Sequence, residues 1–392
     1  MKVPEVKKDK EGFQTANVAL IGTSHFLHDV YTSFLAPALP FLIEKLGISY
    51  GLAGLLHVIQ RLPSLLNPFV GMMADRMSMR YLVIFSPAVT GIAMSLIGIA
   101  PGYVFLALLL LVSGISSTFY HIPTPVMVKK LSGKRIGKGM SFYMLGGELA
   151  RTAGPMVIYG LISIWGLEGT YKMMPLGLIS SGILYFRLGH IKISKDIKKQ
   201  TIELTYWKEF KKYLPIFTIT AGITLFLGAM RSSLSLYLPT FMDSQGESHF
   251  FSQASLSILQ LSGAAGTLIS GTFSDKLGRI KMLLIITIVS PFLMLLFLHV
   301  NGIWQIIILG IMGMFVFAPT SVLLALIHDQ KTEKMAFLNG VYMLLNFFIS
   351  AIMVTIAGFM ADKIGFEKTF TYAAFFSFGA VGVILLNRNK LL

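Results

Sequence analysis

Long apolar runs recur along the whole sequence and restrict the possible folds more than any other feature. A helix needs about 20 predominantly apolar residues to cross a bilayer, and runs of that length fill most of the chain. The gaps between them are short and contain glycine, proline or charged residues. The predicted helices cover residues 17–43, 50–73, 81–100, 103–129, 136–165, 170–189, 213–241, 252–274, 281–300, 303–328, 335–361 and 368–387. The expected fold is an all-α polytopic membrane protein with twelve transmembrane helices.

The composition of the 392 residues agrees with a lipid environment. Hydrophobic residues make up 54% of the chain and charged residues 13%, whereas a soluble domain has about 25% charged residues. The first apolar run is too long for a cleavable signal peptide, whose apolar core spans about 7–15 residues. The sequence contains no cysteine, which excludes disulfides, thiolate metal sites and a cysteine nucleophile. We expect a multi-pass protein of the cell membrane with no cofactor and no metal site.

The basic residues are concentrated in every second gap between the predicted helices, as expected when successive loops lie on opposite sides of a membrane. Of the 33 Lys and Arg residues, 26 lie in or within three residues of the N-terminal tail, the gaps after even-numbered predicted helices or the C-terminal tail. Four lie in or within three residues of the gaps after odd-numbered helices, and three lie deeper inside helices. Cytoplasmic loops are enriched in Lys and Arg, so both termini and the polar stretch 190–212 are expected in the cytoplasm. The net charge of +15 then reflects topology, and nucleic acid is not an expected partner.

One motif occurs twice, after the second and the eighth predicted helix, about 200 residues apart. An aspartate at a helix end can cap a neighbouring helix or pair with arginine, which would hold a cytoplasmic gate shut. The residues of this predicted gate are Gly71, Asp75, Arg76 and Arg80 in the first copy and Gly271, Asp275, Gly278 and Arg279 in the second.

A second repeat supports a duplication of one half of the chain, because Tyr143-Met-Leu and Tyr342-Met-Leu lie 199 residues apart. Two six-helix halves related in this way are a known transporter design. We therefore divide the chain into a tail at 1–16, a six-helix bundle at 17–189, a linker at 190–212 that is partly an amphipathic helix, and a second bundle at 213–392.

The gate motif resembles the loop signature of the major facilitator superfamily, although Ser78 and Met79 stand where glycine and arginine are usual in the first copy. Further stretches resemble the fosmidomycin-resistance-type exporters of that superfamily. These stretches are Ser24-His25 with Asp29, Phe119-Tyr120-His121 with Pro123, and Ser132-Gly133, Arg135, Gly137, Ser141, Gly146-Gly147 and Gly154-Pro155. The resemblance implies transport by alternating access, with proton-coupled efflux of a drug-like compound as the first expectation. Proton-coupled uptake of an organic anion or metabolite is the alternative.

The fifth predicted helix also resembles the antiporter motif of the superfamily through Gly147, Gly154 and Pro155, with a looser spacing than usual. A Gly-Pro pair bends a membrane helix and allows close packing. The resemblance implies that these residues form a closely packed helix face, which we call the seam and which limits leak across the membrane in exporters. A simple packing kink is the alternative.

Ionisable residues inside the predicted helices are candidate functional residues, because a charge within the bilayer is costly. They are His25, His28, Asp29, His57, Arg61, His121, Glu148, Arg151 and Arg231. His25 and Asp29 share a helix face at four-residue spacing, and histidine titrates near neutral pH. We expect this pair to carry protons or contact substrate. For His28 and His57, a hydrogen-bonded role in the core is the alternative.

The remaining charges suggest what is transported. Asp29 is the expected partner of Arg61, while Glu148 and Arg151 either pair with each other or face a cavity. Arg231 has no evident acid within its half, so its partner is either an anionic or zwitterionic group of a small-molecule substrate or a cluster of backbone carbonyls. The predicted site for substrate and protons comprises His25, Asp29, Arg61, His121, Glu148, Arg151 and Arg231.

Other classes of function have little support in the sequence. The motifs of serine hydrolases, zinc proteases and phosphate-binding loops do not occur, and Ser24 is adjacent to His25 on the helix and points elsewhere. We therefore expect neither an enzyme nor coupling to ATP, and we regard a receptor as less well supported than a transporter. The expected transporter acts as a monomer in the lipid bilayer.

Overall fold

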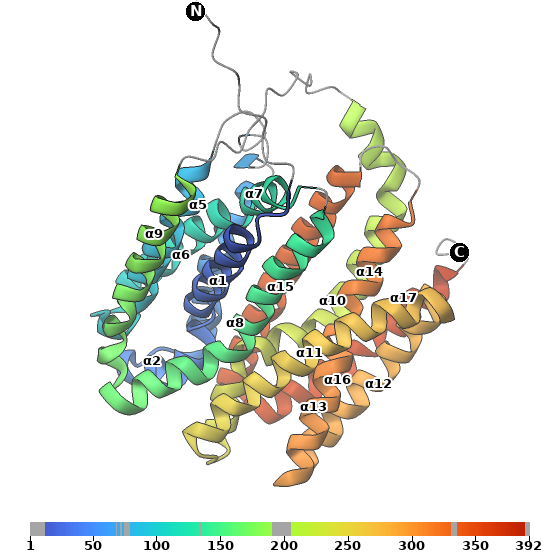
Figure 1. The fold of residues 1–392 in the computed structure, drawn as a ribbon. Coiled ribbons are helices and arrows are strands. Elements are labelled where there is room, and N and C mark those ends of the chain that lie inside the picture. The colour runs from blue at the N-terminus through green and yellow to red at the C-terminus, as the bar shows by residue number, and fades with distance from the viewer. Residues whose placement is uncertain are drawn as a thin grey trace, which may run out of the picture.

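The computed structural model describes residues 12–67, 69–70, 73, 79–133, 135–189, 205–330 and 335–388. These residues form helices joined by short connections, and they contain no β-strand. Helices from α1 to α9 form one side of the molecule, and helices from α10 to α17 form the other side (Figure 1). The prediction of an all-α fold is confirmed.

The helices of the first side occupy residues 15–188. They are α1 (Thr15–Thr32), α2 (Leu35–Leu46), α3 (Tyr50–Arg61), η1 (Leu62–Leu66), α5 (Arg80–Ser95), η2 (Ile97–Ile99), α6 (Tyr103–His121), α7 (Thr124–Leu131), α8 (Ile136–Trp165), η3 (Leu167–Met173) and α9 (Met174–Leu188).

The helices of the second side follow the same pattern of long and broken segments. They are α10 (Thr205–Ser244), α11 (His249–Leu277), α12 (Arg279–His299), α13 (Ile303–Phe317), α14 (Pro319–His328), α15 (Met335–Ile364), α16 (Phe366–Ser377) and α17 (Gly379–Leu386). Helix α10 already begins inside the stretch 190–212 predicted as a linker, and residues 190–204 lie outside the described residues.

Within the described residues, nine helical segments are long and apolar enough to cross a membrane. Three of the predicted helices are not among them. Helix α9 has 15 residues, Glu148 and Arg151 lower the mean hydropathy of α8, and the range 50–73 includes residues that the structure does not describe. The count of twelve therefore stays a prediction.

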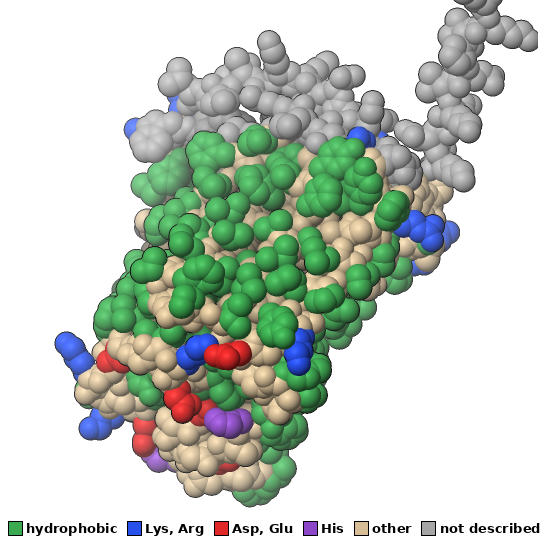
Figure 2. All heavy atoms as spheres, turned by 90° about the vertical axis from the view of Figure 1, so that its left-hand side faces the viewer, with side chains coloured by type: hydrophobic (Ala, Val, Ile, Leu, Met, Phe, Trp, Pro, Cys, Tyr) green, Lys and Arg blue, Asp and Glu red, His purple; other side chains and the backbone are tan. Residues whose placement is uncertain are grey.

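The outer surface is strongly apolar, as a lipid environment requires. Phe186 is 83% exposed and Leu268 is 75% exposed, and many other large hydrophobic side chains are exposed as well. Figure 2 shows a broad band of hydrophobic side chains on the face that includes α9, with charged side chains gathered below it. A contiguous apolar surface of this size is a liability in water and is solvated by lipid, so the chain is a multi-pass membrane protein.

Proline divides three of the predicted helices. Because proline has no N–H, it removes a helical hydrogen bond to the residue four positions earlier. Pro37 removes such a bond at the junction of α1 and α2, Pro123 and Pro125 stand at the junction of α6 and α7, and Pro319 opens α14. The predicted range 368–387 also divides, at Phe378, and no proline accounts for that break.

Hydrogen bonds join the two sides of the molecule at one end, which we call the joined end. Asp362, near the end of α15, accepts hydrogen bonds from the backbone N–H groups of Tyr50 (2.7 Å) and Gly51 (2.9 Å) at the start of α3. Tyr237 of α10 donates to the Tyr50 carbonyl (2.8 Å), and Gln253 of α11 donates to a carbonyl of α2 (3.0 Å). Nearer the centre, α8 packs against α11 and α3 packs against α15.

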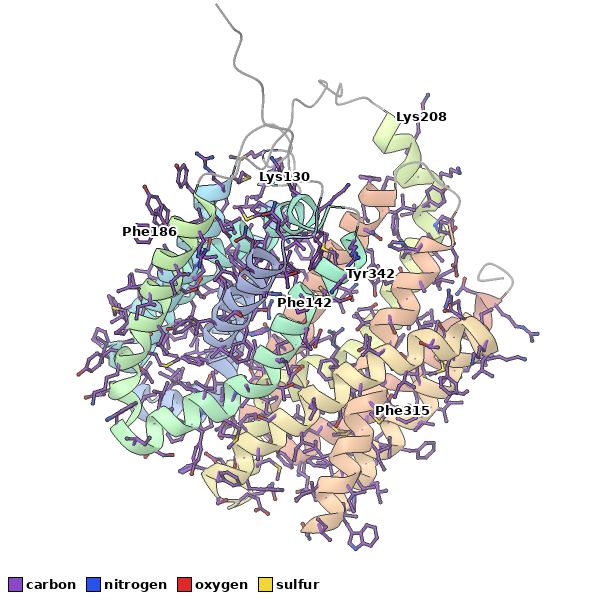
Figure 3. The ribbon with its side chains drawn as sticks, viewed as in Figure 1. Lys130, Phe142, Phe186, Lys208, Phe315 and Tyr342 are labelled. Atoms are coloured by element: carbon purple, nitrogen blue, oxygen red, sulfur yellow. The ribbon has the colours of Figure 1, made fainter. Side chains whose placement is uncertain are left out.

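The opposite end is marked by basic residues from both sides. Figure 3 shows Lys130 of α7 and Lys208 of α10 at this end, and it shows Phe142 of α8 and Tyr342 of α15 near the centre of the molecule. The side chains predicted to carry the function lie between these two ends.

Candidate functional site

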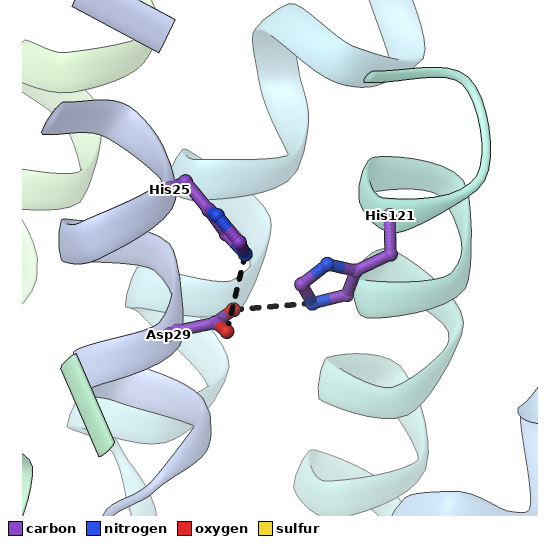
Figure 4. Close-up of side chains that lie close together, drawn as sticks. All are labelled: His25, Asp29 and His121. Carbon is purple, nitrogen blue, oxygen red and sulfur yellow. Dashed lines mark ion pairs between the residues drawn. The ribbon is translucent and has the colours of Figure 1, made fainter. Parts of the chain in front are cut away.

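Helix α1 places Asp29 among three histidines, and we call these four residues the Asp29 cluster. One carboxylate oxygen of Asp29, Oδ2, lies 3.2 Å from His25 Nε2. The other, Oδ1, lies 3.0 Å from His28 Nδ1 and 3.1 Å from His121 Nε2. Figure 4 shows His25 and Asp29 on α1 with the His121 ring reaching Asp29 from α6. The four-residue spacing of His25 and Asp29 thus produces a contact on one helix. Tertiary packing brings His121 of α6 to the same carboxylate.

Two tyrosines hold the histidine rings in place. The His25 ring stacks on Tyr143 of α8, with centroids 4.0 Å apart and an angle of 11° between planes. The His28 ring stacks on Tyr120 of α6 at 4.3 Å and 12°. The Tyr143 hydroxyl lies 3.2 Å from Nδ1 of His121, so this tyrosine contacts two members of the cluster.

The hydrogen bonds of His25 indicate where a proton is needed. Its Nδ1 lies 2.6 Å from the backbone oxygen of Tyr143. A carbonyl oxygen only accepts, so Nδ1 carries a hydrogen and donates it. In a neutral ring, Nε2 then presents a lone pair to Asp29 Oδ2 at 3.2 Å, and two lone pairs at that distance repel. One proton, on the imidazole or on the carboxyl, makes the contact favourable.

His28 is bound on both sides, as the alternative of a hydrogen-bonded role in the core expected. Its Nε2 lies 3.1 Å from the Thr90 hydroxyl, and Thr90 donates to Ser116 at 2.8 Å. Ser116 in turn donates to the backbone oxygen of Ser86 at 3.0 Å. This buried chain of donors ends on a carbonyl and fixes the orientation of His28 toward Asp29.

The members of the cluster differ in their access to water. The His28 side chain is fully buried, and the His25 and Asp29 side chains are 6% and 11% exposed. The His121 side chain is 35% exposed. His121 is therefore the most exposed member of the cluster.

The same side chains are compact enough to consider a metal ion. One ligand atom each of His25, Asp29 and His121 lies within 4.8 Å of the others. The trio holds a single carboxylate, however, and Arg61 is close enough to act on Asp29 electrostatically. A divalent cation would add to an already positive region, whereas a proton would not need a second acid. The charge around this trio therefore disfavours a divalent cation.

The predicted seam of α8 lies directly against the cluster. A Cβ atom added at Gly147 would stand 2.7 Å from Cε1 of His25 and 3.3 Å from Oδ2 of Asp29. A Cβ at Gly154 would overlap the Ser33 hydroxyl of the same neighbouring helix. With Pro155 buried beside it, this seam allows α8 to approach α1 closely enough to enclose the cluster.

The predicted pairing of Arg61 with Asp29 is not found, because imidazole nitrogens approach both oxygens of Asp29. Among the described residues, Arg61 has no carboxylate within ion-pair distance. Glu148 and Arg151 do pair with each other, with side chains that are 38% and 48% exposed. Arg151 is also close enough to interact electrostatically with Arg61 and Arg231. These three arginines come from α3, α8 and α10 and are close enough to interact electrostatically with one another.

Arg231 lies on the second side, where its guanidinium donates to the Thr320 hydroxyl at 2.7 Å. Its Cζ lies 5.0 Å from the centre of the Phe317 ring. In the part of the chain that the structure describes, no carboxylate lies within ion-pair distance of Arg231, in agreement with the sequence expectation.

The second copy of the gate motif forms a cluster within its own half. Arg279 pairs with Asp275 one turn before it, and its Nε donates to Asp329 at 3.0 Å. Gly278 has a φ of +90°, a conformation that side-chain-bearing residues rarely adopt. In the first copy, Gly71, Asp75 and Arg76 lie outside the described residues. Arg80 stacks on Tyr81, with its Cζ 4.7 Å from the ring centre.

Sequence reasoning missed Asp362, the acid that binds the N-terminus of α3. A signal for it exists, since Gly358, Asp362, Lys363 and Gly365 repeat the spacing of the gate motif. This third copy follows the eleventh predicted helix and lies at the joined end. Its carboxylate accepts two backbone N–H groups at a helix N-terminus, where negative charge is favoured.

Known proteins resemble this chain over most of its length. The Fosmidomycin resistance protein of Escherichia coli (strain K12) is 24% identical over 381 residues, covering 94% of this chain and 92% of that protein. The Multidrug resistance protein MdtG of Serratia proteamaculans (strain 568) is 27% identical over 301 residues, covering 72% and 71% of the two chains.

Two solved transporter structures show the same fold. A bacterial homolog of the human lysosomal transporter Spinster, in an inward-facing and unoccupied conformation, superposes with a TM-score of 0.82 at 13% identity, covering 97% of this chain and 98% of that one. The nucleoside transporter NupG superposes with a TM-score of 0.74 at 16% identity, covering 95% and 99%. A family model described as the Major Facilitator Superfamily matches residues 21–354. With its apolar helices and two-sided arrangement, the chain belongs to this superfamily of membrane transporters, which are not enzymes.

Proposed function

We propose that the chain exports a small molecule in exchange for protons, and that the Asp29 cluster is the proton site. The observation that carries this proposal is the contact of His25 with Asp29. The Tyr143 carbonyl fixes the His25 tautomer, so the contact needs one proton that either partner can hold. The names of two relatives, which refer to fosmidomycin resistance and multidrug resistance, favour export over uptake.

The orientation of the chain is part of the proposal. The pattern of Lys and Arg residues supports cytoplasmic termini, a cytoplasmic segment at 190–212 and twelve spans arranged as two six-helix bundles. The joined end is then the outer face of the membrane, and the described state is open toward the cytoplasm. The similarity to a structure titled inward-facing supports this orientation.

In this state a proton leaves the cluster toward the cytoplasm and substrate enters from the same side. His121 is the exit, because its partly exposed ring lies 3.1 Å from Asp29 Oδ1. Loss of the proton makes the cluster one unit more negative. The central arginines, beginning with Arg61, are close enough to respond to that change. Alternating access then carries the substrate outward and exposes the cluster to external protons.

Proteoliposomes can test the direction of coupling, with fosmidomycin as the first compound and a panel of drugs beside it. An acidic lumen with an alkaline exterior provides an outward proton gradient. Antiport predicts that a transported compound accumulates in the lumen under this gradient and that accumulation stops when a protonophore collapses it. Accumulation only with an alkaline lumen would establish symport and contradict the proposal.

The seam offers a sharper test through Gly147→Ala. The new methyl group would displace the His25 ring, since its position lies 2.7 Å from Cε1. A displacement of about 1 Å in a reacting group can cost about 100-fold in rate, so we expect proton-driven transport to fall by at least about tenfold. The matched control is Gly160→Ala in the same helix, where nothing lies within 4 Å of the added atom. Equal transport by the two variants would count against a role of the seam at the cluster.

If Asp275 is part of a cytoplasmic gate, the variant Asp275→Asn should transport substrate more slowly. The change removes the ion pair with Arg279 and leaves Arg279 bound to Asp329. We expect slower transport with normal insertion into the membrane, measured as initial uptake per mole of reconstituted protein. Lys281→Gln, at an exposed position of α12 that lies outside the motif, serves as the control. Wild-type uptake by Asp275→Asn would show that this aspartate is not part of a gate.

A further inference from the structure

The second side of the molecule holds a polar pocket that the proton site does not use. It is lined by residues of α10, α13, α14 and α15, and we call it the Arg231 pocket. Its members are Thr224, Leu227, Gly228, Arg231, Val316, Pro319, Thr320, Leu323, Tyr342 and Asn346. Figure 3 shows Tyr342 near the centre of the molecule, and in the pocket it lies with residues of α10, α13 and α14.

The positive charge of this pocket is not neutralised by the protein. The Arg231 guanidinium has five N–H donors, and one of its terminal nitrogens binds the Thr320 hydroxyl at 2.7 Å. Within the described residues no carboxylate is in ion-pair distance of Arg231. The Glu148 carboxylate acts on it electrostatically, but that carboxylate is already paired with Arg151.

Two hydroxyl groups in the same pocket also lack partners. The Tyr342 hydroxyl and the Thr224 hydroxyl are buried, and neither makes a hydrogen bond among the described residues, although the Asn346 side chain lies near that of Tyr342. Tyr342 as a whole is only 4% exposed. A buried donor without a partner costs about 1–3 kcal/mol, and two of them beside an unpaired arginine point to a ligand that supplies acceptor atoms.

A group that satisfies these donors must carry negative charge and several acceptor oxygens. Guanidinium groups bind carboxylates and phosphate-type oxyanions through two parallel hydrogen bonds. Hydroxyl donors of tyrosine and threonine can bind a further oxygen of the same group. A cationic ligand would meet Arg231 with Arg61 and Arg151 nearby, so the electrostatics of the region oppose it.

The rest of the pocket is apolar and leaves little space. Leu227, Val316 and Leu323 form an apolar wall beside the polar groups, and the Phe317 ring lies against the guanidinium of Arg231. The free volume is about 30 Å³, which has room for a small head group and not for an aromatic body.

We propose that the Arg231 pocket is a subsite for the oxyanionic head group, phosphonate or carboxylate, of an exported compound whose body lies outside the pocket. This inference rests on the proposed function for the direction of movement, but the binding itself requires no gradient. Arg231 and the Tyr342 hydroxyl bind the oxyanion, and the Asp29 cluster on the other side carries the proton.

Binding to the purified full-length protein in detergent tests the subsite, with four probes that share a benzene ring. Phenylphosphonate and benzoate carry oxyanions, benzyl alcohol is neutral and benzylamine is cationic. We expect ligand-detected NMR titrations to show saturable binding of phenylphosphonate, benzoate or both, and no saturable binding of the other two probes. Preferential binding of benzylamine, or equal binding of all four probes, would overturn the proposal.

Variants of the pocket separate a binding role from a structural one. Tyr342→Phe removes only an unpartnered hydroxyl, so the fold should be kept while the dissociation constant of the oxyanion rises about tenfold. Arg231→Gln should abolish saturable binding, and Arg231→Lys should restore part of it by returning the charge. Tyr372→Phe, on the exposed face of α16, is the matched control.

The outcomes distinguish this inference from the proposed function. Unchanged affinity in both Tyr342→Phe and Arg231→Gln would remove the subsite and leave proton-coupled export standing. Retained oxyanion binding in a protein that fails to exchange protons for substrate would leave the subsite standing without the proposed coupling.

Discussion

Asp29→Asn is expected to reduce proton-driven transport to the level of liposomes without protein. The substitution keeps the shape of the side chain but removes the negative charge that three histidine nitrogens approach within 3.0–3.2 Å. An amide cannot hold the exchangeable proton that the His25 contact needs. Exchange of labelled for unlabelled substrate across the membrane, which moves no net proton, should persist in the variant.

The pairing of those two assays guards against simple unfolding, because a misfolded protein would lose both activities. A matched control is Asp243→Asn, which removes another aspartate that contacts a histidine, His249 at 3.0 Å, away from the cluster. It should leave both assays unchanged. Proton-driven accumulation by Asp29→Asn at the wild-type rate would exclude this carboxylate as the coupling group.

Asp362→Asn is expected to shift the protein away from the described state. It weakens the two hydrogen bonds that join α15 to the start of α3. The interaction of an exposed carboxylate with a helix N-terminus is worth about 1 kcal/mol. Losing it would change the ratio between the state closed at the joined end and the state open there by about fivefold. The joined end should therefore open more often, and the opposite end should close.

The absence of cysteine allows this shift to be measured with introduced labels. Lys129→Cys and Lys208→Cys place one spin label on each side at the end where Figure 3 shows Lys130 and Lys208. Asp362→Asn should increase the population with the shorter distance between labels, whereas the control Asp243→Asn should not. Identical distance distributions in all three proteins would contradict a latch at Asp362.

Helix periodicity alone predicted the central contact of the site. His25 and Asp29 meet because residues four apart share a helix face, and no knowledge of packing is needed. His121 reaches the same carboxylate only because α6 lies beside α1, which a local pattern does not encode. The contact of His28 with Asp29 likewise depends on Tyr120 and Thr90 from neighbouring helices.

Other features escaped sequence reasoning for physical reasons. Asp362 repeats a motif that was already recognised twice, but its partners are backbone N–H groups 311 and 312 residues away in the chain. The polar character of the Arg231 pocket depends on hydroxyls from α10, α14 and α15 meeting in space. Hydropathy predicted the helical ranges, while their division at Pro37, Pro123 and Pro319 followed from local chemistry that a hydropathy count ignores.

The most direct test of the central claim is the release of protons when substrate binds to the purified protein. In weakly buffered detergent solution with a pH-indicator dye, adding the exported compound to wild-type protein should release protons, because binding favours the deprotonated cluster. Asp29→Asn should bind the compound and release none. Equal proton release by the wild type and Asp29→Asn would contradict the assignment of the transported proton to the Asp29 cluster.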